Sequence, residues 1–147
     1  MSTKKTLIKN GQLVTSKGVF KKNILIENGK IIKIGKISDT DAEHIIDASQ
    51  KYILPGIIDP QVHFRDPGFP DKEDLRTGSM AAAAGGVTTF FEMPNTKPAT
   101  TTIEKLNQKY DIASQKSIVN YSFFFGATSD NLNEIKNLQN NCGLKIF

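Results

Sequence analysis

The chain has 147 residues, enough for one ordinary domain, and its 38% hydrophobic and 23% charged residues exclude wholesale disorder. The net charge of +4 is mild, and no aromatic residues alternate with the lysines of the first third, so a solvated lysine face is favoured over a nucleic-acid surface. With one cysteine, no signal peptide and no apolar run of the roughly 20 residues that span a bilayer, we expect a cytoplasmic protein without internal disulfides or membrane contact.

Residues 1–52 are predicted to form a small β-rich domain. Asn10-Gly11 and Asn28-Gly29 each separate two β-rich runs. Asn-Gly is the strongest short hairpin signal, because both central residues of a type I′ turn need positive φ. We therefore expect a hairpin at each place, and a further short strand at Ile45-Ile46.

After residue 52, segments typical of strands and helices alternate, which indicates parallel βαβ units. Strands are expected at 57–65, 87–93, 118–125 and 143–147, and helices at 72–84, 101–116 and 131–140. Three residues are the predicted helix starts: Asp71 as an N-cap, and Thr101 and Asn131 at the head of capping-box sequences.

The alternating part of the chain stops in the middle of a fold. Four strands are too few for a closed (β/α)₈ barrel, which needs about 250 residues. No helix follows the strand at 143–147, so an open sheet would end in an unprotected edge. A piece of a larger protein is favoured over a small sheet whose last strand is covered by a partner.

The segment Asp59–Arg65 contains the candidate metal-binding and substrate-binding residues. Asp59, Gln61, His63 and Arg65 alternate along one strand, so their side chains are expected on the same side at its end, where α/β folds build their sites. His63 could be a zinc ligand or a histidine hydrogen-bonded in a loop. Arg65 could hold a substrate carboxylate, or pair with Asp66 or Asp71.

Five motifs over residues 50–147 resemble the dihydroorotases of the amidohydrolase superfamily. They are Leu54-Pro55-Gly56-Ile57-Ile58-Asp59 with Val62–Gly68, Thr77-Gly78-Ser79, residues 81–89, Met93-Pro94-Asn95-Thr96, and Gly143–Phe147. The resemblance implies an α/β fold: a partial (β/α)₈ TIM barrel over residues 53–147, made of its first strands and helices. It also implies that residues 1–52 supply the N-terminal strands of a composite β-sandwich.

The resemblance implies site roles as well. His63 would bind metal, and catalytic Lys145, carboxylated on Nζ, would bridge two zinc ions. A buried lysine suits this chemistry because desolvation favours the neutral, nucleophilic amine. An ordinary lysine with its charged end in solvent is the alternative for Lys145. Arg65 and Asn95 would bind the substrate carboxylate, although Asn95 also suits a turn after Pro94.

The implied activity is hydrolysis of a cyclic amide by a metal-activated hydroxide. Its substrates would be dihydroorotate and N-carbamoyl-L-aspartate, interconverted reversibly in de novo pyrimidine biosynthesis. Arg65 and Asn95 favour a carboxylated substrate over those of the alternative, a hydantoinase or allantoinase. A homo-oligomer is expected, with aspartate transcarbamoylase as a further candidate partner.

The sequence departs from the family pattern at Gln61, which replaces the first histidine of the usual His-x-His motif. Glutamine is a poorer zinc ligand than imidazole, so Gln61 could bind weakly and leave one metal or none. A non-catalytic scaffold with a decayed metal site is therefore a second alternative. Because the later histidines and the catalytic aspartate of the family lie beyond the position of Phe147, we expect the fragment alone to be inactive.

Overall fold

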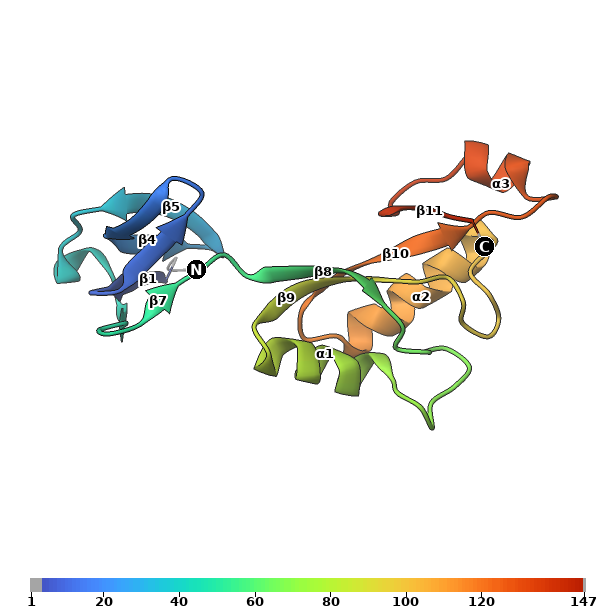
Figure 1. Cartoon of the computed structure of the whole chain (residues 1–147), viewed down its shortest axis with the longest axis horizontal. Helices are drawn as coiled ribbons and strands as arrows, with labels where there is room; N and C mark the ends of the chain where they lie inside the picture. Colours follow the sequence, from blue (N-terminus) through green and yellow to red (C-terminus); the bar gives the residue numbers. More distant parts are fainter. Residues whose placement is uncertain (1–3, 147) are drawn as a thin grey trace. The chain divides into compact units, whose positions relative to one another are not determined.

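The structure is a computed structural model that describes residues 4–146, and the chain divides into two compact units, Met1–Pro55 and Gly56–Phe147. The first unit holds β1 (Lys5–Lys9), β2 (Gln12–Thr15), β3 (Gly18–Lys21), β4 (Asn23–Glu27), β5 (Lys30–Gly35), the 3₁₀ turn η1 (Asp39–Asp41), β6 (His44–Asp47) and β7 (Tyr52–Ile53) (Figure 1). The second holds β8 (Ile57–Val62), α1 (Leu75–Ala84), β9 (Val87–Glu92), α2 (Ile103–Lys116), β10 (Asn120–Gly126), α3 (Leu132–Lys136) and β11 (Gly143–Lys145). Phe147, the predicted end of the last strand, lies outside the described residues.

Two sheets make up the first unit, ordered β5-β4-β1-β6 and β3-β2-β7. The hairpin predicted at Asn28-Gly29 is confirmed: β4 and β5 pair antiparallel, and the turn residues have φ of 51° and 73°. The hairpin predicted at Asn10-Gly11 is wrong, because β1 and β2 belong to different sheets. A Cβ on Gly11 would lie 2.5 Å from Ile53 Cδ1, so glycine is needed there for close packing as the chain crosses between sheets.

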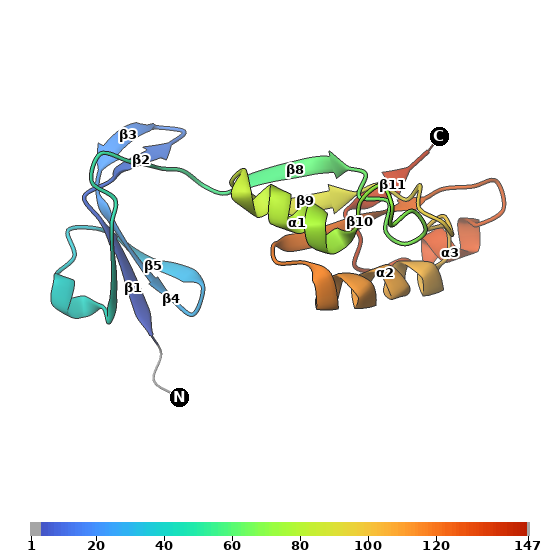
Figure 2. The ribbon, with the colours of Figure 1, turned by 90° about the horizontal axis from the view of Figure 1, so that it is seen from below.

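The second unit is a four-stranded sheet ordered β11-β10-β9-β8, and each neighbouring pair is parallel. Helices α1 and α2 lie against one face of this sheet (Figure 2). The predicted parallel βαβ units are confirmed, and the α/β architecture is that of a half-barrel. In residues 4–146, no helix is long and apolar enough to cross a membrane.

Helix α1 begins three residues later than the sequence predicts. Its N-cap is Asp74 rather than Asp71, because the Asp74 carboxylate accepts hydrogen bonds from the backbone and hydroxyl of Thr77, at 2.7 and 2.9 Å. The buried carboxylate of Asp66 accepts from the backbone N–H of Leu75 at 3.2 Å. Two carboxylates therefore fix the first turn, and residues 71–73 stay in the loop.

The other two helices also differ from prediction at their ends. The N-cap of α2 is Thr102 rather than Thr101, and the helix ends at Lys116 as predicted. Helix α3 ends at Lys136, well before residue 140, and Asn131 makes no side-chain cap. Instead, Asn131 Nδ2 donates to the carbonyls of Thr101 and Gly126, at 2.9 and 2.8 Å. The prediction of a capping box was wrong, because the Asn131 side chain hydrogen-bonds to neighbouring loops instead.

The core of the second unit lies between the sheet and the two long helices. Its buried members are Phe64, Leu75, Phe90, Leu106, Ala113, Phe123 and Phe125. The rings of Phe64 and Phe90 meet edge to face with centroids 4.7 Å apart, an arrangement that adds roughly 0.5–1.5 kcal/mol to the burial of their area. Because Phe64 directly follows His63, this contact fixes the end of β8 against the core.

A buried ion pair sits in the same layer. Lys109 Nζ of α2 lies 2.8 Å from Glu92 Oε2 of β9, and each side chain is only 1% exposed. Lys109 Nζ also donates to the Met93 carbonyl at 3.2 Å and lies 4.6 Å from the centre of the Phe123 ring. Removing one partner of such a pair costs about 3–5 kcal/mol, because the other charge is left buried alone.

The start of α1 should depend on Asp74 and not on Asp71. Asp74→Ala should lower the free energy of unfolding by about 0.5–2 kcal/mol at neutral pH, whereas Asp71→Ala should change it by less than about 0.5 kcal/mol. Urea denaturation followed by circular dichroism measures both. An equal effect of the two substitutions would contradict the assignment of Asp74 as the cap.

The same cap has a pH dependence. Hydrogen bonds from Thr77 hold the pKa of Asp74 below its usual value of 3.8. A lowered pKa means that the stabilisation is complete above pH 3.8 and is lost as the pH falls through the folded-state pKa. The difference in stability between wild type and Asp74→Ala should therefore shrink below about pH 4.

Candidate functional site

Two of the predicted site residues meet at the ends of neighbouring parallel strands. His63 follows β8 and Asn95 lies just beyond β9, and His63 Nδ1 is 2.9 Å from Asn95 Oδ1. Since an amide oxygen only accepts, this contact assigns the ring proton to Nδ1. The Nε2 lone pair is then free for a metal, which is the usual arrangement of a ligating histidine.

Backbone hydrogen bonds fix the two segments that carry these side chains. The N–H of Met93 donates to the Val62 carbonyl at 3.0 Å, which extends the pairing of β8 and β9 to the residue before His63. The N–H of Thr100 donates to the carbonyl of Pro94 at 2.9 Å. Met93 and Pro94 are buried, so Asn95 projects from a backbone that has little freedom.

Arg65 does not lie on the strand. The prediction that β8 carries His63 and Arg65 in alternation is wrong, because β8 ends at Val62 and Arg65 adopts a left-handed φ of 65°. The register also shifts between Asp59 and Val62, so strict alternation from Asp59 is interrupted. Bulges of this kind often re-aim side chains beside active sites.

Among the described residues, neither alternative partner, Asp66 or Asp71, forms an ion pair with Arg65. Among residues 4–146, Asp66 forms its ion pair with Lys116, at 2.6 Å from Oδ2 to Nζ. Arg65 instead lines a hollow of about 600 Å³ together with Asn95, and this volume is within the range of about 300–1,000 Å³ typical of small-molecule sites. The two residues predicted to bind a substrate carboxylate therefore share one hollow.

Sequence reasoning missed Lys97, which lines the same hollow and adds a second cation to it. Phe69, Pro94 and Ala99 supply its apolar walls. The signal in the sequence was weak, because a lysine in a polar loop is ordinarily a solvated surface residue. A hollow with two cations, one amide and apolar walls suits a small anionic molecule with a ring.

The two loops around this hollow are joined. Lys97 N–H donates to the Pro67 carbonyl at 3.0 Å. Gly68 has a φ of 109°, and a Cβ there would lie 2.3 Å from the Lys97 carbonyl oxygen. Only glycine fits, both because the φ is left-handed and because the backbones approach so closely.

Gln61 and Lys145 are not part of the His63–Asn95 contact. Gln61 is exposed on β8, and its backbone N–H donates to Asp59 Oδ1 at 3.0 Å. Lys145 is half-buried on β11, the opposite edge strand of the sheet, in register with Gly126. Three strand spacings amount to roughly 14 Å in a flat sheet, so His63 and Lys145 approach one metal centre only if the sheet curves.

A catalytic zinc site uses three protein ligands. Within residues 4–146, no group of three or more His, Cys, Asp or Glu side chains is placed to hold a metal. His63, with Nδ1 engaged and Nε2 available, fits a single ligand position. Lys145 would fit a second one only after carboxylation, because an ammonium cannot bind a cation.

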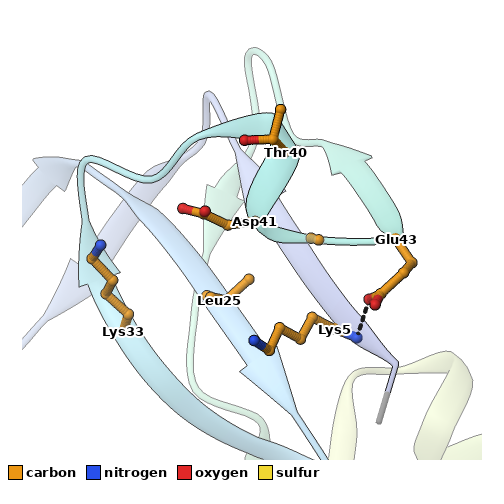
Figure 3. Close-up of a pocket in the computed structure, with 7 residues that line it drawn as sticks. Lys5, Leu25, Lys33, Thr40, Asp41 and Glu43 are labelled. Atoms are coloured by element: carbon orange, nitrogen blue, oxygen red, sulfur yellow. Dashed lines mark hydrogen bonds between the residues drawn. The ribbon is translucent and has the colours of Figure 1, made fainter. Parts of the chain in front are cut away.

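A second pocket lies entirely within the first unit (Figure 3). It is lined by Lys5, Leu25, Lys33, Thr40, Asp41, Ala42 and Glu43. The Glu43 carboxylate accepts from the backbone N–H of Lys5 at 2.6 Å, which lowers the pKa of Glu43. Because two lysines face two carboxylates, the charges compensate one another, and the pocket has no preference for a ligand of one sign.

The close approach of the two loops should make Gly68 difficult to replace. Gly68→Ala should lower the free energy of unfolding by about 3 kcal/mol or more, because strain at positive φ adds to a backbone clash. The matched control is Gly86→Ala, whose φ is also positive, at 82°, but whose Cβ would meet nothing within 4 Å. Its cost should be about 1 kcal/mol. Thermal unfolding of both variants measures the difference, and equal costs would contradict the close approach.

Most of the second unit is similar to a known protein family. A family model described as Dihydro-orotase-like matches residues 50–143. An allantoinase from Desulfitobacterium hafniense (strain DSM 10664 / DCB-2) is 42% identical over 148 positions, covering 100% of this chain and 33% of that protein. A dihydroorotase from Enterococcus faecalis is 44% identical over 117 positions, covering 78% of this chain and 27% of its own length.

A solved structure agrees with these relatives. The L-hydantoinase from Arthrobacter aurescens superposes with a TM-score of 0.86 at 36% identity, over 90% of this chain and 30% of that one. The chain thus spans about a third of the length of the relatives it matches. The family model covers well over half of the chain and includes the His63–Asn95 contact and the hollow beside it. The chain therefore belongs to the dihydroorotase-like family.

Proposed function

We propose that this chain is the N-terminal part of a metal-dependent cyclic amidohydrolase, which reversibly opens dihydroorotate to N-carbamoyl-L-aspartate in pyrimidine biosynthesis. The observation that carries the proposal is the His63–Asn95 contact beside a hollow that Arg65 also lines. The relatives named dihydroorotase, allantoinase and hydantoinase support the cyclic-amide chemistry. The preference for dihydroorotate follows from the cations of the hollow, because this substrate carries a carboxylate.

In the proposed mechanism, His63 Nε2 would hold a zinc ion, with carboxylated Lys145 as a second ligand. The bound metal would supply a hydroxide for attack on the ring amide carbonyl. Asn95 serves two partners: its Oδ1 accepts from His63, which leaves its Nδ2 to donate to the substrate. The Arg65 guanidinium would bind the substrate carboxylate as a planar fork, and Lys97 would add charge beside it.

The proposal includes the arrangement of the chain. Residues 1–52 would form a small β-domain, as the N-terminal strands of a composite β-sandwich, and residues 53–147 the first βα units of a barrel. We propose that the 147-residue chain alone does not turn over substrate, since one imidazole and one carboxylated lysine are fewer than the three protein ligands of a catalytic zinc. A homo-oligomer, and association with aspartate transcarbamoylase, belong to the same proposal for the whole protein.

A second candidate is hydrolysis of allantoin or a hydantoin. The observation in its favour is the allantoinase relative, which is 42% identical along the full chain. The two functions differ at Arg65, because the rings of allantoin and hydantoin carry no carboxylate for a guanidinium to bind.

Arg65 provides the test in the whole protein. Arg65→Met should raise KM for dihydroorotate by roughly 10–100-fold, the loss expected for one hydrogen-bonded charge. Arg76→Met is the matched control, because Arg76 is exposed on α1 and outside the hollow, and should leave KM unchanged. Steady-state kinetics on dihydroorotate, allantoin and hydantoin measure the effect. Turnover of hydantoin or allantoin without dihydroorotate would refute the assignment of Arg65.

A third candidate, a non-catalytic scaffold, arises from Gln61. Zinc content per chain, measured by mass spectrometry on the whole protein, separates it from the enzyme. We expect bound zinc in the wild type that is lost in His63→Ala, and more zinc in Gln61→His, since imidazole is the better ligand. A wild type without zinc, together with a Gln61→His variant that binds two ions, would favour the scaffold.

A further inference from the structure

We propose that Glu92 and Lys109 are positioning residues, whose buried ion pair sets the peptide units that bring Asn95 to His63. This role rests on the proposed function, because the His63–Asn95 contact matters for catalysis only if these residues bind metal and substrate. Neither Glu92 nor Lys109 lines the hollow. Their effect would therefore pass through the backbone at the ends of β8 and β9.

The ion pair is costly for the core that contains it. Burial raises the pKa of Glu92 and lowers the pKa of Lys109, so each charge is disfavoured where it sits. Apart from the ion-pair contact with Lys109 and an interaction with the backbone of Arg65, the Glu92 oxygens have no hydrogen-bond partner among the described residues. Apolar side chains of similar volume would serve the core equally well or better. Stability alone therefore does not account for the pair.

The contacts of Lys109 lead to the site in two steps. Nζ donates to the carbonyl of Met93 at 3.2 Å, and the N–H of Met93 donates to the carbonyl of Val62 at 3.0 Å. Val62 directly precedes His63, and Met93 lies two residues before Asn95. The ammonium is thus hydrogen-bonded to Met93, the residue whose own N–H pairs with the segment that carries His63.

The position of Lys109 Nζ is itself defined from several sides. Glu92 Oε2 lies 2.8 Å from Lys109 Nζ and the Phe123 ring centre lies 4.6 Å from it, while the carbonyl of Met93 accepts a hydrogen bond from it. A charged group held this way has one favourable place, because each displacement loses an interaction in a region of low dielectric. A flexible apolar side chain would fill the same volume without fixing the Met93 carbonyl.

A second lysine of α2 acts on the same segment from its other end. Lys116 Nζ lies 2.6 Å from Asp66 Oδ2, three residues after His63. Lys109 and Lys116 are two helical turns apart and so lie on one face of the helix. The Asp66 carboxylate also acts electrostatically on Glu92 and Lys109. Helix α2 therefore holds the segments on both sides of His63 through charges.

The test reads the hydrogen bond itself. The measurement uses the whole protein, and the ¹⁵N signals of His63 are identified as those that a His63→Gln variant lacks. In protein treated with a chelator, ¹⁵N NMR should show His63 protonated on Nδ1, and Asn95→Ala should abolish this signature. The variant Glu92→Leu/Lys109→Met should keep the circular dichroism of the wild type but lose most of the Asn95-dependent Nδ1 signal. Lys105→Met, a half-buried lysine of the same helix, is the matched control and should change nothing.

A folded double variant that retains the wild-type signal would overturn the proposal, because the pair would then serve only packing. If the double variant does not fold, the isosteric Glu92→Gln is measured instead, and an unchanged signal there overturns the proposal equally. Loss of the fold in both variants would also contradict it, because the pair would then be required by the core. Loss of the signal in a whole protein whose wild type hydrolyses no cyclic amide would support the positioning role while refuting the proposed function.

Discussion

The parallel pairing of β8 with β9 is the constraint on which the rest of the second unit depends. It brings two strand ends that are about thirty residues apart in sequence to one edge of the sheet, so that His63 and Asn95 meet. Phe64 and Phe90 pack beneath this edge, and Met93 continues the pairing beyond the last strand residue. A site formed in this way needs no long-range motion to assemble, because the backbone already fixes the distance between its donors and acceptors.

The sequence predicted the parallel βαβ order because the apolar runs and helix signals were long and regular. The sequence prediction was wrong where the same residues suit two different local structures. Asn-Gly served a hairpin at residues 28–29 but a crossing between sheets at residues 10–11, since Ile53, distant in sequence, packs against Gly11. Likewise, Asp71 and Asp74 both suit an N-cap, and the contact of Asp66 with Leu75 favoured the later one.

For the site, residue types were easier to predict than their backbone. His63, Arg65 and Asn95 were identified through a resemblance, and the structure places all three around one contact and one hollow. The left-handed turn at Arg65 was not visible, because alternation assumes an extended chain with no bulge. The buried Glu92–Lys109 pair was also not predicted. The local sequence does not show whether a charged side chain is solvated or buried in an ion pair.

The contact between Gly68 and Lys97 has a consequence for redesign of the hollow. The N–H of Lys97 in one loop donates to the Pro67 carbonyl of the other, and no methyl group fits between the loops at Gly68. The two loops therefore form a single wall of the hollow. Mutagenesis aimed at a larger or differently charged ring should therefore vary both loops together. Libraries that randomise one loop alone would sample mostly sequences in which this wall separates and the hollow loses its shape.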